Sequence, residues 1–302
     1  MNGNSIVMMV KPFRFRGNEQ TAGTNAFQSA VGDGDIHEEA WREFGGLVEL
    51  LRREGVEVWV FEDDGKEDTP DSIFPNNWVS FHGNMMILYP MLAENRRKEK
   101  RPYIIEELRT RTGNPRITDL SMHEKRNLFL EGTGSLVFDP KSRLAYASLS
   151  PRTDEGLCSD VCRMLAFTHI FFSATDRNGN AIYHTNVVMC VGEEFAVIGS
   201  ECIVDVKERE RVLSFLMRSG KEVIELSMNQ IENFAGNMYE LENSKGEKLI
   251  LMSDRAYSSL DKQQLERLAN HGKLIHCDLK TIETYSGGSA RCMIAHVNLE
   301  KE

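Results

Sequence analysis

Near the carboxyl end of the sequence, a cysteine follows a pair of glycines in the segment TYSGGSARCMIAHV. Because glycine has no Cβ, Gly287 and Gly288 let the backbone approach a ligand closely. The thiolate of Cys292 could then act as a nucleophile on a bound carbon. Without further support, the same segment is a glycine turn before a last strand that carries a buried cysteine.

Two further segments place an imidazole and a carboxylate at the ends of expected strands. In YHTNVVMCVG, His184 and Asn186 are expected to begin a strand, on which alternate residues share one face. In NLFLEGTGSLVFD, Glu131 is expected to end a strand, just before two glycines. Taken singly, the histidine is a surface residue and the glutamate is a solvated carboxylate in a turn.

A fourth segment, DTPDSIFPNNWVSF, is expected to form a loop before a strand. It carries Asp71, Asn76 and Asn77, and these residue types are common turn formers, so the loop alone explains them. Together, however, the four segments supply a thiol, an imidazole, carboxylates and amides. Nucleophilic catalysis with acid and base assistance uses these groups.

The composition predicts a folded chain that binds a small molecule. Of its 302 residues, 41% are hydrophobic and 27% are charged, which is ordinary for globular proteins. The net charge of −10 disfavours a nucleic acid or an anionic membrane as a partner. No run approaches the ~20 apolar residues of a membrane-spanning helix, and the first residues lack the pattern of a secretion signal. We therefore expect a cytoplasmic protein.

The cysteines and glycines give no sign of a metal or a nucleotide cofactor. The six cysteines are scattered, without a CxxC pair or a Cys/His cluster at the spacing of a zinc site. The phosphate-binding patterns GxxxxGK[ST] and GxGxxG do not occur in the sequence. We therefore expect neither a metal nor a cofactor.

Helical and strand patterns alternate along the chain in five similar units. Amphipathic helical spacing covers residues 36–54, 94–112, 154–167, 205–219 and 255–271. A short strand pattern follows each of them, at 56–61, 115–120, 168–174, 221–226 and 272–277. Hairpins are clearest in NVVMCVG with EEFAVIGSECIV and in MYELEN with GEKLILMS. We predict an α/β fold in which one ββαβ unit repeats five times.

A period of about 50 to 60 residues indicates a repeat architecture rather than two domains. Five units that close on themselves would form a ring, an α/β propeller, with the first hairpin of each unit lining its centre. The expectation is a single catalytic domain of residues 1–302. An open α/β sheet with irregular insertions is the alternative. The charged runs GKEDT and NRRKEKR are expected to be solvated loops.

Read together, GGSARCM, HTN, EGTGS and PDSIFPNN resemble the guanidine-modifying, or pentein, superfamily. This superfamily comprises arginine deiminases, dimethylarginine hydrolases and amidinotransferases, built as five-bladed pseudo-symmetric α/β propellers. The resemblance spans nearly the whole chain and includes SLSPRTDE, which is similar to a segment of arginine deiminases and dimethylarginine hydrolases. The segment RFRGNEQTAGTNAFQ most resembles the branch of citrulline-utilisation hydrolases.

The resemblance implies a cysteine-dependent hydrolase of non-peptide C–N bonds. Cys292 would be the nucleophile, His184 the acid and base, and Glu131 the carboxylate that holds the reacting nitrogen or water. The thiolate would attack a guanidino or ureido carbon, and water would then clear the covalent thio-adduct. Arg152 would bind the α-carboxylate of an amino-acid substrate, unless it is an exposed residue at the start of the third helix. Assembly into a homo-oligomer is left open.

Two departures from the arginine-type pattern favour a neutral substrate. Asn77 and Asn186 stand where those enzymes commonly carry Asp. Two carboxylates suit a guanidinium cation, whereas an amide can donate to a neutral ureido oxygen. We therefore expect citrulline, cleaved to ornithine, ammonia and carbon dioxide, ahead of an arginine derivative, while Asp71 keeps a cation open. A neutral substrate brings no positive charge, so His184 as imidazolium would have to stabilise the Cys292 thiolate.

Two alternatives share the fold but not the reaction. An amidinotransferase would form the same adduct and pass it to an amine instead of water. A non-catalytic propeller would only bind a partner, and the net charge together with the intact set of Cys292, His184 and Glu131 disfavours it.

Overall fold

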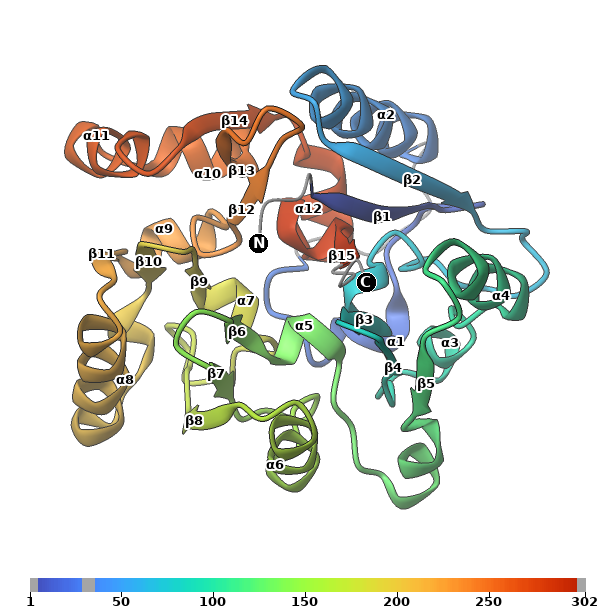
Figure 1. Cartoon of the computed structure of the whole chain (residues 1–302), viewed down its shortest axis with the longest axis horizontal. Helices are drawn as coiled ribbons and strands as arrows, with labels where there is room; N and C mark the ends of the chain where they lie inside the picture. Colours follow the sequence, from blue (N-terminus) through green and yellow to red (C-terminus); the bar gives the residue numbers. More distant parts are fainter. Residues whose placement is uncertain (1–4, 29–35, 298–302) are drawn as a thin grey trace.

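The strands of the protein form five three-stranded sheets (Figure 1). The computed structural model describes residues 5–28 and 36–297. In every sheet, the middle strand pairs antiparallel with one neighbour and parallel with the other. The predicted α/β organisation in five similar units is confirmed at this level. The predicted domain of residues 1–302 also takes in 1–4, 29–35 and 298–302, which lie outside the described residues.

Four sheets use consecutive strands, and the fifth joins strands from distant parts of the sequence. The consecutive sheets are β3 (Val79–His82), β4 (Met85–Leu88) and β5 (Arg116–Asp119); β6 (Val137–Asp139), β7 (Leu144–Ser148) and β8 (Thr168–Phe172); β9 (Met189–Val191), β10 (Phe195–Ile198) and β11 (Glu222–Glu225); β12 (Tyr239–Glu242), β13 (Lys248–Ser253) and β14 (Lys273–Cys277). The fifth contains β15 (Ala295–Val297), β1 (Ile6–Lys11) and β2 (Glu57–Glu62), with Ile6 opposite Val297.

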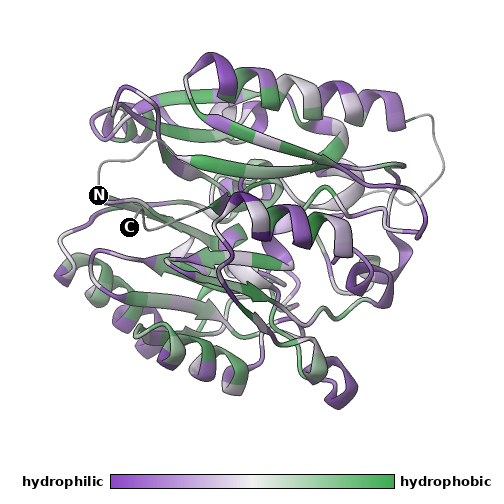
Figure 2. Cartoon of the chain, turned by 45° about the vertical axis from the view of Figure 1, so that its right-hand side comes forward, coloured by the Kyte–Doolittle hydropathy of each residue, from purple (hydrophilic) through white to green (hydrophobic). Residues whose placement is uncertain are grey.

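A helix connects the middle strand of each sheet to the parallel strand beside it, and these helices lie on the outside in Figure 1. They are α2 (His37–Arg53), α4 (Pro102–Arg111), α6 (Glu155–Met164), α8 (Val206–Arg218) and α11 (Lys262–Ala269). Figure 2 shows hydrophobic colour concentrated on the strands and polar colour on these helices. In α2, the buried residues Phe44, Leu47 and Leu51 recur every three or four positions, so one face packs on the sheet.

Two of the predicted helices are each two helices in the structure. Residues 94–112 form α3 (Glu94–Arg97) and then α4, which begins at Pro102 because proline has no N–H to continue the earlier turn. Residues 255–271 form α10 (Asp254–Ser259) and α11, whose N-cap Asp261 makes a capping box with Gln264.

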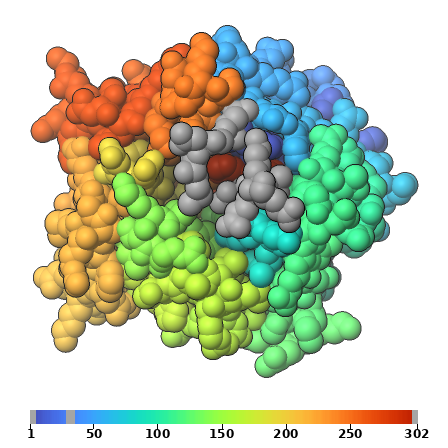
Figure 3. All heavy atoms as spheres, viewed as in Figure 1, coloured from blue at the N-terminus to red at the C-terminus, as the bar shows by residue number. Residues whose placement is uncertain are grey.

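Neighbouring sheets contact each other around the middle of the molecule. Strand β15 lies against β3, and β9 lies against both β6 and β12. Figure 3 shows the chain colours following one another round this face, from blue through green and yellow to red. The five sheets therefore fit a five-unit pseudo-symmetric arrangement, while closure into a propeller stays a prediction.

A short turn precedes the first strand of four of these units. The turns are η1 (Pro75–Asn77) before β3, α5 (Gly132–Ser135) before β6, α7 (Thr185–Val188) before β9, and η4 (Ala290–Met293) before β15. In the remaining unit, residues 233–238 connect α9 (Met228–Glu232) to β12. The turns touch, since α5 contacts both η1 and α7, and η1 contacts η4. Side chains from distant parts of the sequence can therefore meet here.

The remaining short elements are α1 (Glu19–Ala22), η2 (Ser121–Arg126), η3 (Ser200–Cys202) and α12 (Lys280–Ser286). Among the helices of the described part of the chain, none combines the length and the apolar character needed to cross a bilayer.

Two glycines give a matched test of the backbone. Gly46 lies within α2 and Gly113 follows α4 at φ +76°, and an added Cβ would meet nothing within 4 Å at either position. Gly46→Ala should raise the free energy of unfolding by about 0.5–1 kcal/mol, because alanine is the better helix former. Gly113→Ala should lower it by about 1 kcal/mol, because alanine is strained at positive φ. Urea unfolding measures both, and stabilisation of the Gly113 variant would contradict the assignment.

Candidate active site

The candidate nucleophile lies in a turn rather than on the strand that the sequence predicted. Cys292 belongs to η4, a single 3₁₀ turn that ends before β15 begins, and its side chain is buried. The backbone N–H of Cys292 donates to the carbonyl of Ser289 at 2.9 Å. Ser289 Oγ in turn donates to Glu283 Oε1 on α12 at 2.6 Å. The position of the sulfur is therefore set by a hydrogen-bonded turn.

His184 and Glu131 come together although they are far apart in sequence. Glu131 is the N-cap of α5 and His184 is the N-cap of α7, so neither lies on the strand expected for it. Both side chains are buried, and His184 Nε2 lies 2.8 Å from Glu131 Oε2. The other carboxylate oxygen of Glu131 accepts from the backbone N–H of Leu92 at 3.1 Å. The contact between α5 and α7 thus makes a carboxylate–imidazole pair.

This pairing fixes which imidazole nitrogen carries the proton. Burial would raise the pKa of Glu131, but the guanidinium of Arg152 and the bond to His184 outweigh it and hold the pKa well below its usual range. An ionised carboxylate can only accept, so Nε2 of His184 is the protonated nitrogen and Nδ1 keeps its lone pair. Burial lowers the pKa of His184 to about 4, although Glu131 works against that shift. The imidazole is therefore neutral near pH 7.

Two buried arginines approach the same carboxylate oxygen of Glu131. Arg152 Nη1 lies 3.5 Å and Arg96 Nη1 lies 3.6 Å from Oε2. Arg152 is not an exposed residue at the start of α6, whose N-cap is Asp154; it is buried and donates to Thr24 Oγ1 at 2.8 Å. These two cations are the reason that an ionised Glu131 can be buried.

Arg96 also connects Glu131 to the turn that carries Asn77. Its Nη1 donates to Asn77 Oδ1 at 2.9 Å, and its Nε lies 3.9 Å from Asp71 Oδ2. Glu99 accepts two further hydrogen bonds from Arg96, at 2.8 and 3.0 Å. Burial raises the pKa of Asp71, and Arg96 opposes this rise. Three of the predicted site residues, Asp71, Asn77 and Glu131, therefore surround one arginine.

Several buried polar atoms at this point have no hydrogen-bond partner among the described residues: Asp71 Oδ1, Asn77 Nδ2 and Arg152 Nε. Asn77 Nδ2 and His184 Nδ1 both border Gly134, where an added Cβ would lie 2.5 and 2.7 Å from them. Unpaired buried polar groups are costly, and they are common where a ligand completes the bonding.

Cys292 contacts amides rather than the imidazole. Its Sγ lies 3.5 Å from Nδ2 of Asn186 and 3.3 Å from Nδ2 of Asn237. Within the described residues, no hydrogen bond joins this sulfur to His184. The expected thiolate–imidazolium pair is therefore not preformed, because burial keeps the imidazole of His184 neutral.

Sequence reasoning missed Arg96 and Asn237. Arg96 lies in NRRKEKR, and the prediction of a solvated loop is wrong there: Arg96, Glu99 and Arg101 are buried, whereas residues 66–68 of GKEDT are exposed. The spacing of Arg96 and Glu99, three residues apart on a helical turn, was the available signal. Asn237 stands two residues before β12, as Asn77 stands two before β3, so the repeat itself pointed to it.

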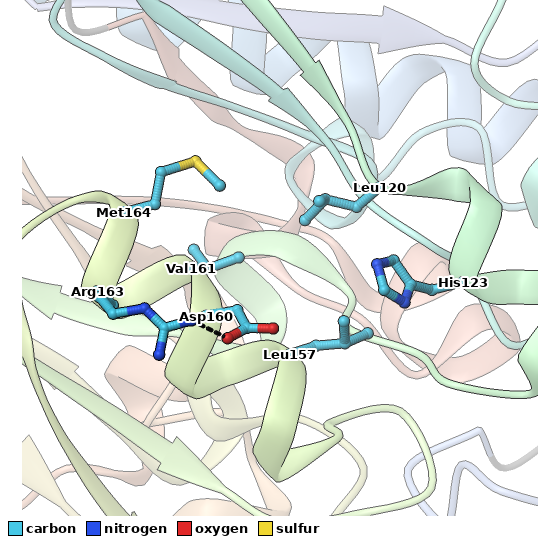
Figure 4. A pocket seen from close by; sticks show the side chains of 7 residues that line it. All are labelled: Leu120, His123, Leu157, Asp160, Val161, Arg163 and Met164. Carbon is cyan, nitrogen blue, oxygen red and sulfur yellow. Dashed lines mark hydrogen bonds and ion pairs between the residues drawn. The ribbon is translucent and has the colours of Figure 1, made fainter.

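A surface pocket lies apart from these residues. It measures about 360 Å³ and lies between η2 and α6, lined by Leu120, His123, Leu157, Asp160, Val161, Arg163 and Met164 (Figure 4). It contains none of the predicted site residues. In the described part of the chain, no group of three or more His, Cys, Asp or Glu side chains could hold a metal ion.

The family model for N,N dimethylarginine dimethylhydrolase, eukaryotic, matches residues 11–299. The chain belongs to this family. The predicted membership of the guanidino-modifying superfamily is thereby confirmed, and so is the prediction of an enzyme that hydrolyses C–N bonds, at the level of the family. A comparison with curated proteins finds no significant match.

Solved structures share the fold at low sequence identity. The N-terminal domain of ArgZ, covalently bound to a reaction intermediate, is 19% identical with a TM-score of 0.77, and the match covers 98% of each chain. ArgZ is an arginine dihydrolase from cyanobacteria. Unliganded AgrE is 18% identical (TM-score 0.76), with 99% of this chain covering 40% of that longer chain. The dimethylarginine hydrolase DDAH from Pseudomonas aeruginosa, complexed with citrulline, is 14% identical (TM-score 0.67), over 98% of this chain and 100% of that one.

The imidazole of His184 should stay uncharged from pH 7.5 to 5.5, because its pKa is lowered to about 4. In unfolded protein the same group should titrate near the reference value of about 6.5. Its contribution to the free energy of unfolding should therefore decrease as the pH falls from about 6.5 to 4, where only the unfolded chain takes up the proton. NMR of ¹³C-labelled histidine, with His184→Asn for assignment, measures this. A folded-state midpoint near 6.5 would contradict the neutral imidazole.

Proposed function

We propose that this protein is a cysteine-dependent hydrolase of the ureido C–N bond of an amino acid, with citrulline as the substrate. The products are ornithine, ammonia and carbon dioxide. The proposal takes the five units as one catalytic domain, closed into a five-bladed propeller with the site at its centre. The pairing of β15 with β1 and the contact of β15 with β3 support closure.

One observation carries the choice of substrate: a buried donor and a buried acceptor lie unpaired beside one arginine. Arg96 can only donate, so its bond to Asn77 Oδ1 leaves Asn77 Nδ2 as the atom presented to a ligand. Asp71 Oδ1 is an unpaired acceptor. A ureido group has a carbonyl oxygen to accept from Asn77 and N–H groups to donate to Asp71. A guanidinium has only donors and cannot pair with Nδ2 of Asn77.

The charge of Arg96 also favours a neutral substrate. Its guanidinium already contacts both Asn77 and Asp71, the side chains proposed to hold the reacting group. A second guanidinium at the same place would be repelled by it. A neutral ureido group avoids this repulsion and can accept the amide N–H of Asn77.

In the proposed reaction, Cys292 and His184 divide the cleavage into two steps. The thiol of Cys292 passes its proton to Nδ1 of His184, and the sulfur attacks the ureido carbon. The imidazolium then protonates the departing nitrogen as the C–N bond breaks, which leaves a thio-adduct. Glu131 accepts from Nε2–H throughout and stabilises the imidazolium while it exists.

Water completes the reaction. The neutral imidazole of His184 deprotonates the water, which attacks the carbon of the adduct. The C–S bond breaks, the sulfur of Cys292 is regenerated, and the carbamic acid formed by the two steps separates into an amine and carbon dioxide. Arg152 keeps one unpaired N–H at Nε, which supports the proposal that it holds the α-carboxylate.

A second candidate is the hydrolysis of arginine itself in two successive rounds. Arginine plus water would give citrulline and ammonia, and citrulline would react as above. The unpaired Oδ1 of Asp71 supports this candidate, because a carboxylate acceptor suits a guanidinium N–H. ArgZ, which shares the fold, is described as an arginine dihydrolase.

Purified protein should release ornithine, ammonia and carbon dioxide from citrulline, and Cys292→Ala should release none. The panel includes arginine, agmatine and methylated arginines, with ammonia and amino-acid products as readouts. Citrulline accumulating from arginine before ornithine would establish the second candidate. A new guanidino compound formed only with an added acceptor amine would indicate an amidinotransferase. Turnover of none of these substrates would contradict the proposed function.

Asn77→Asp and Asn77→Leu separate the amide donor from the charge. Both variants lose the donor Nδ2, so kcat/KM for citrulline should fall by about 10²-fold in each. Only the aspartate adds a carboxylate, so the ratio of arginine to citrulline turnover should rise in Asn77→Asp alone. Steady-state kinetics on both substrates measures this. Unchanged turnover of citrulline in both variants would remove Asn77 from the site.

A further inference from the structure

Asn237 is a buried amide that neither the sequence pattern nor the proposed reaction uses. It lies in the loop of residues 233–238 between α9 and β12, and its side chain is 1% exposed. Its amide contacts three groups: the backbone N–H of Arg291, the backbone carbonyl of Asn186 and the sulfur of Cys292. It therefore joins the turn of the nucleophile to the turn of the imidazole.

The orientation of this amide is fixed by its partners. The N–H of Arg291 can only donate, so the group 3.0 Å from it is Oδ1 of Asn237. The carbonyl of Asn186 can only accept, so the group 2.8 Å from it is Nδ2. A flipped amide would place two donors together and two acceptors together. The second N–H of Nδ2 is left for Cys292 Sγ, at 3.3 Å.

The backbone around Asn237 is shaped to bring it there. An added Cβ on Gly236 would lie 2.1 Å from the carbonyl oxygen of Val187, so only glycine allows the loop to lie against α7. Phe234 adopts φ +61° although it is bulky and buried. Such backbone strain is held in place by surrounding structure and clusters at functional sites.

Asn186 offers a second amide to the same sulfur. Its Nδ2 lies 3.5 Å and its Oδ1 lies 3.9 Å from Cys292 Sγ. The oxygen can accept from the thiol and the nitrogen can donate to the thiolate. Hydrogen bonds to the charged form of a group lower its pKa. With a neutral imidazole at His184, these amides are the donors that contact the sulfur in the described structure.

We propose that Asn237 is a catalytic residue, whose amide N–H stabilises the thiolate of Cys292. The inference rests on the proposed function in one respect, that Cys292 is the nucleophile. When the thiol loses its proton, the negative charge on sulfur is held by the N–H of Asn237, whose other two hydrogen bonds keep it aimed. Because those bonds do not depend on substrate, the stabilisation is present in the free enzyme.

The test is the pH dependence of alkylation of Cys292 by iodoacetamide without substrate, followed by mass spectrometry of the peptide. The sulfur forms a bond to carbon and iodide leaves, so the rate follows the thiolate fraction. Asn237→Ala should raise the midpoint by about one pH unit, since a hydrogen bond to a charged group is lost. Asn237→Asp should raise it further, because a carboxylate repels the thiolate.

Asn243→Ala is the matched control. Asn243 is also a buried amide that braces two segments, since it donates to the backbone carbonyl of Glu54 at 2.9 Å and to Glu247 at 2.7 Å. Its replacement should lower the melting temperature yet leave the alkylation midpoint of Cys292 unchanged. A purely bracing role of Asn237 predicts that Asn237→Ala behaves like this control, and that result in a folded variant overturns the proposal.

A measurement on unaltered protein keeps the test decisive if the variants do not fold. The side-chain N–H signals of Asn237, assigned by triple-resonance NMR, should shift with pH at the alkylation midpoint of Cys292. Signals that do not move through that midpoint overturn the proposal. A shifted midpoint in Asn237→Ala, in a protein that turns over no ureido or guanidino compound, would instead support the amide donor and reject the proposed function.

Discussion

An ionised carboxylate buried at the centre of the molecule constrains everything around it. Glu131 can be buried in this form only because Arg96, Arg152 and the Nε2–H of His184 surround one of its oxygens. Removing any of these partners would leave charge uncompensated. The same contacts determine the tautomer of the imidazole, the direction of Asn77 and the face of Arg96 that remains available. The chemistry of the site therefore follows from how one charge is neutralised.

The fold meets this constraint by repetition. Each unit places a turn immediately before its first strand, and those turns meet in the middle, so five distant parts of the sequence contribute polar groups to one place. Outside the centre, strands and amphipathic helices bury the apolar residues in the ordinary way. The units therefore separate two tasks: their outer parts supply stability, and their inner turns supply the reacting groups.

The sequence predicted the fold better than it predicted the backbone of the site. Period, glycine ends and alternating strands indicated five α/β units, because these are properties of local segments. The inner turns were misjudged as strands at His184 and Cys292, since single helical turns are too short to show a period. Arg96 was read as solvated, because a charged run is ordinarily exposed, and only tertiary contacts with Glu131 and Asn77 reveal the cost of its burial.

The pairing of β1 with β15 has a consequence for the order of synthesis. During translation, β1 and β2 emerge early, but the antiparallel edge of their sheet stays open until β15 follows, almost the whole described chain later. The turn that holds Cys292 directly precedes that last strand. Contacts between such distant segments form slowly, because a long loop must be ordered first. A polypeptide released before β15 would lack both the reactive sulfur and the seam, so a truncated product would not acquire a reactive site.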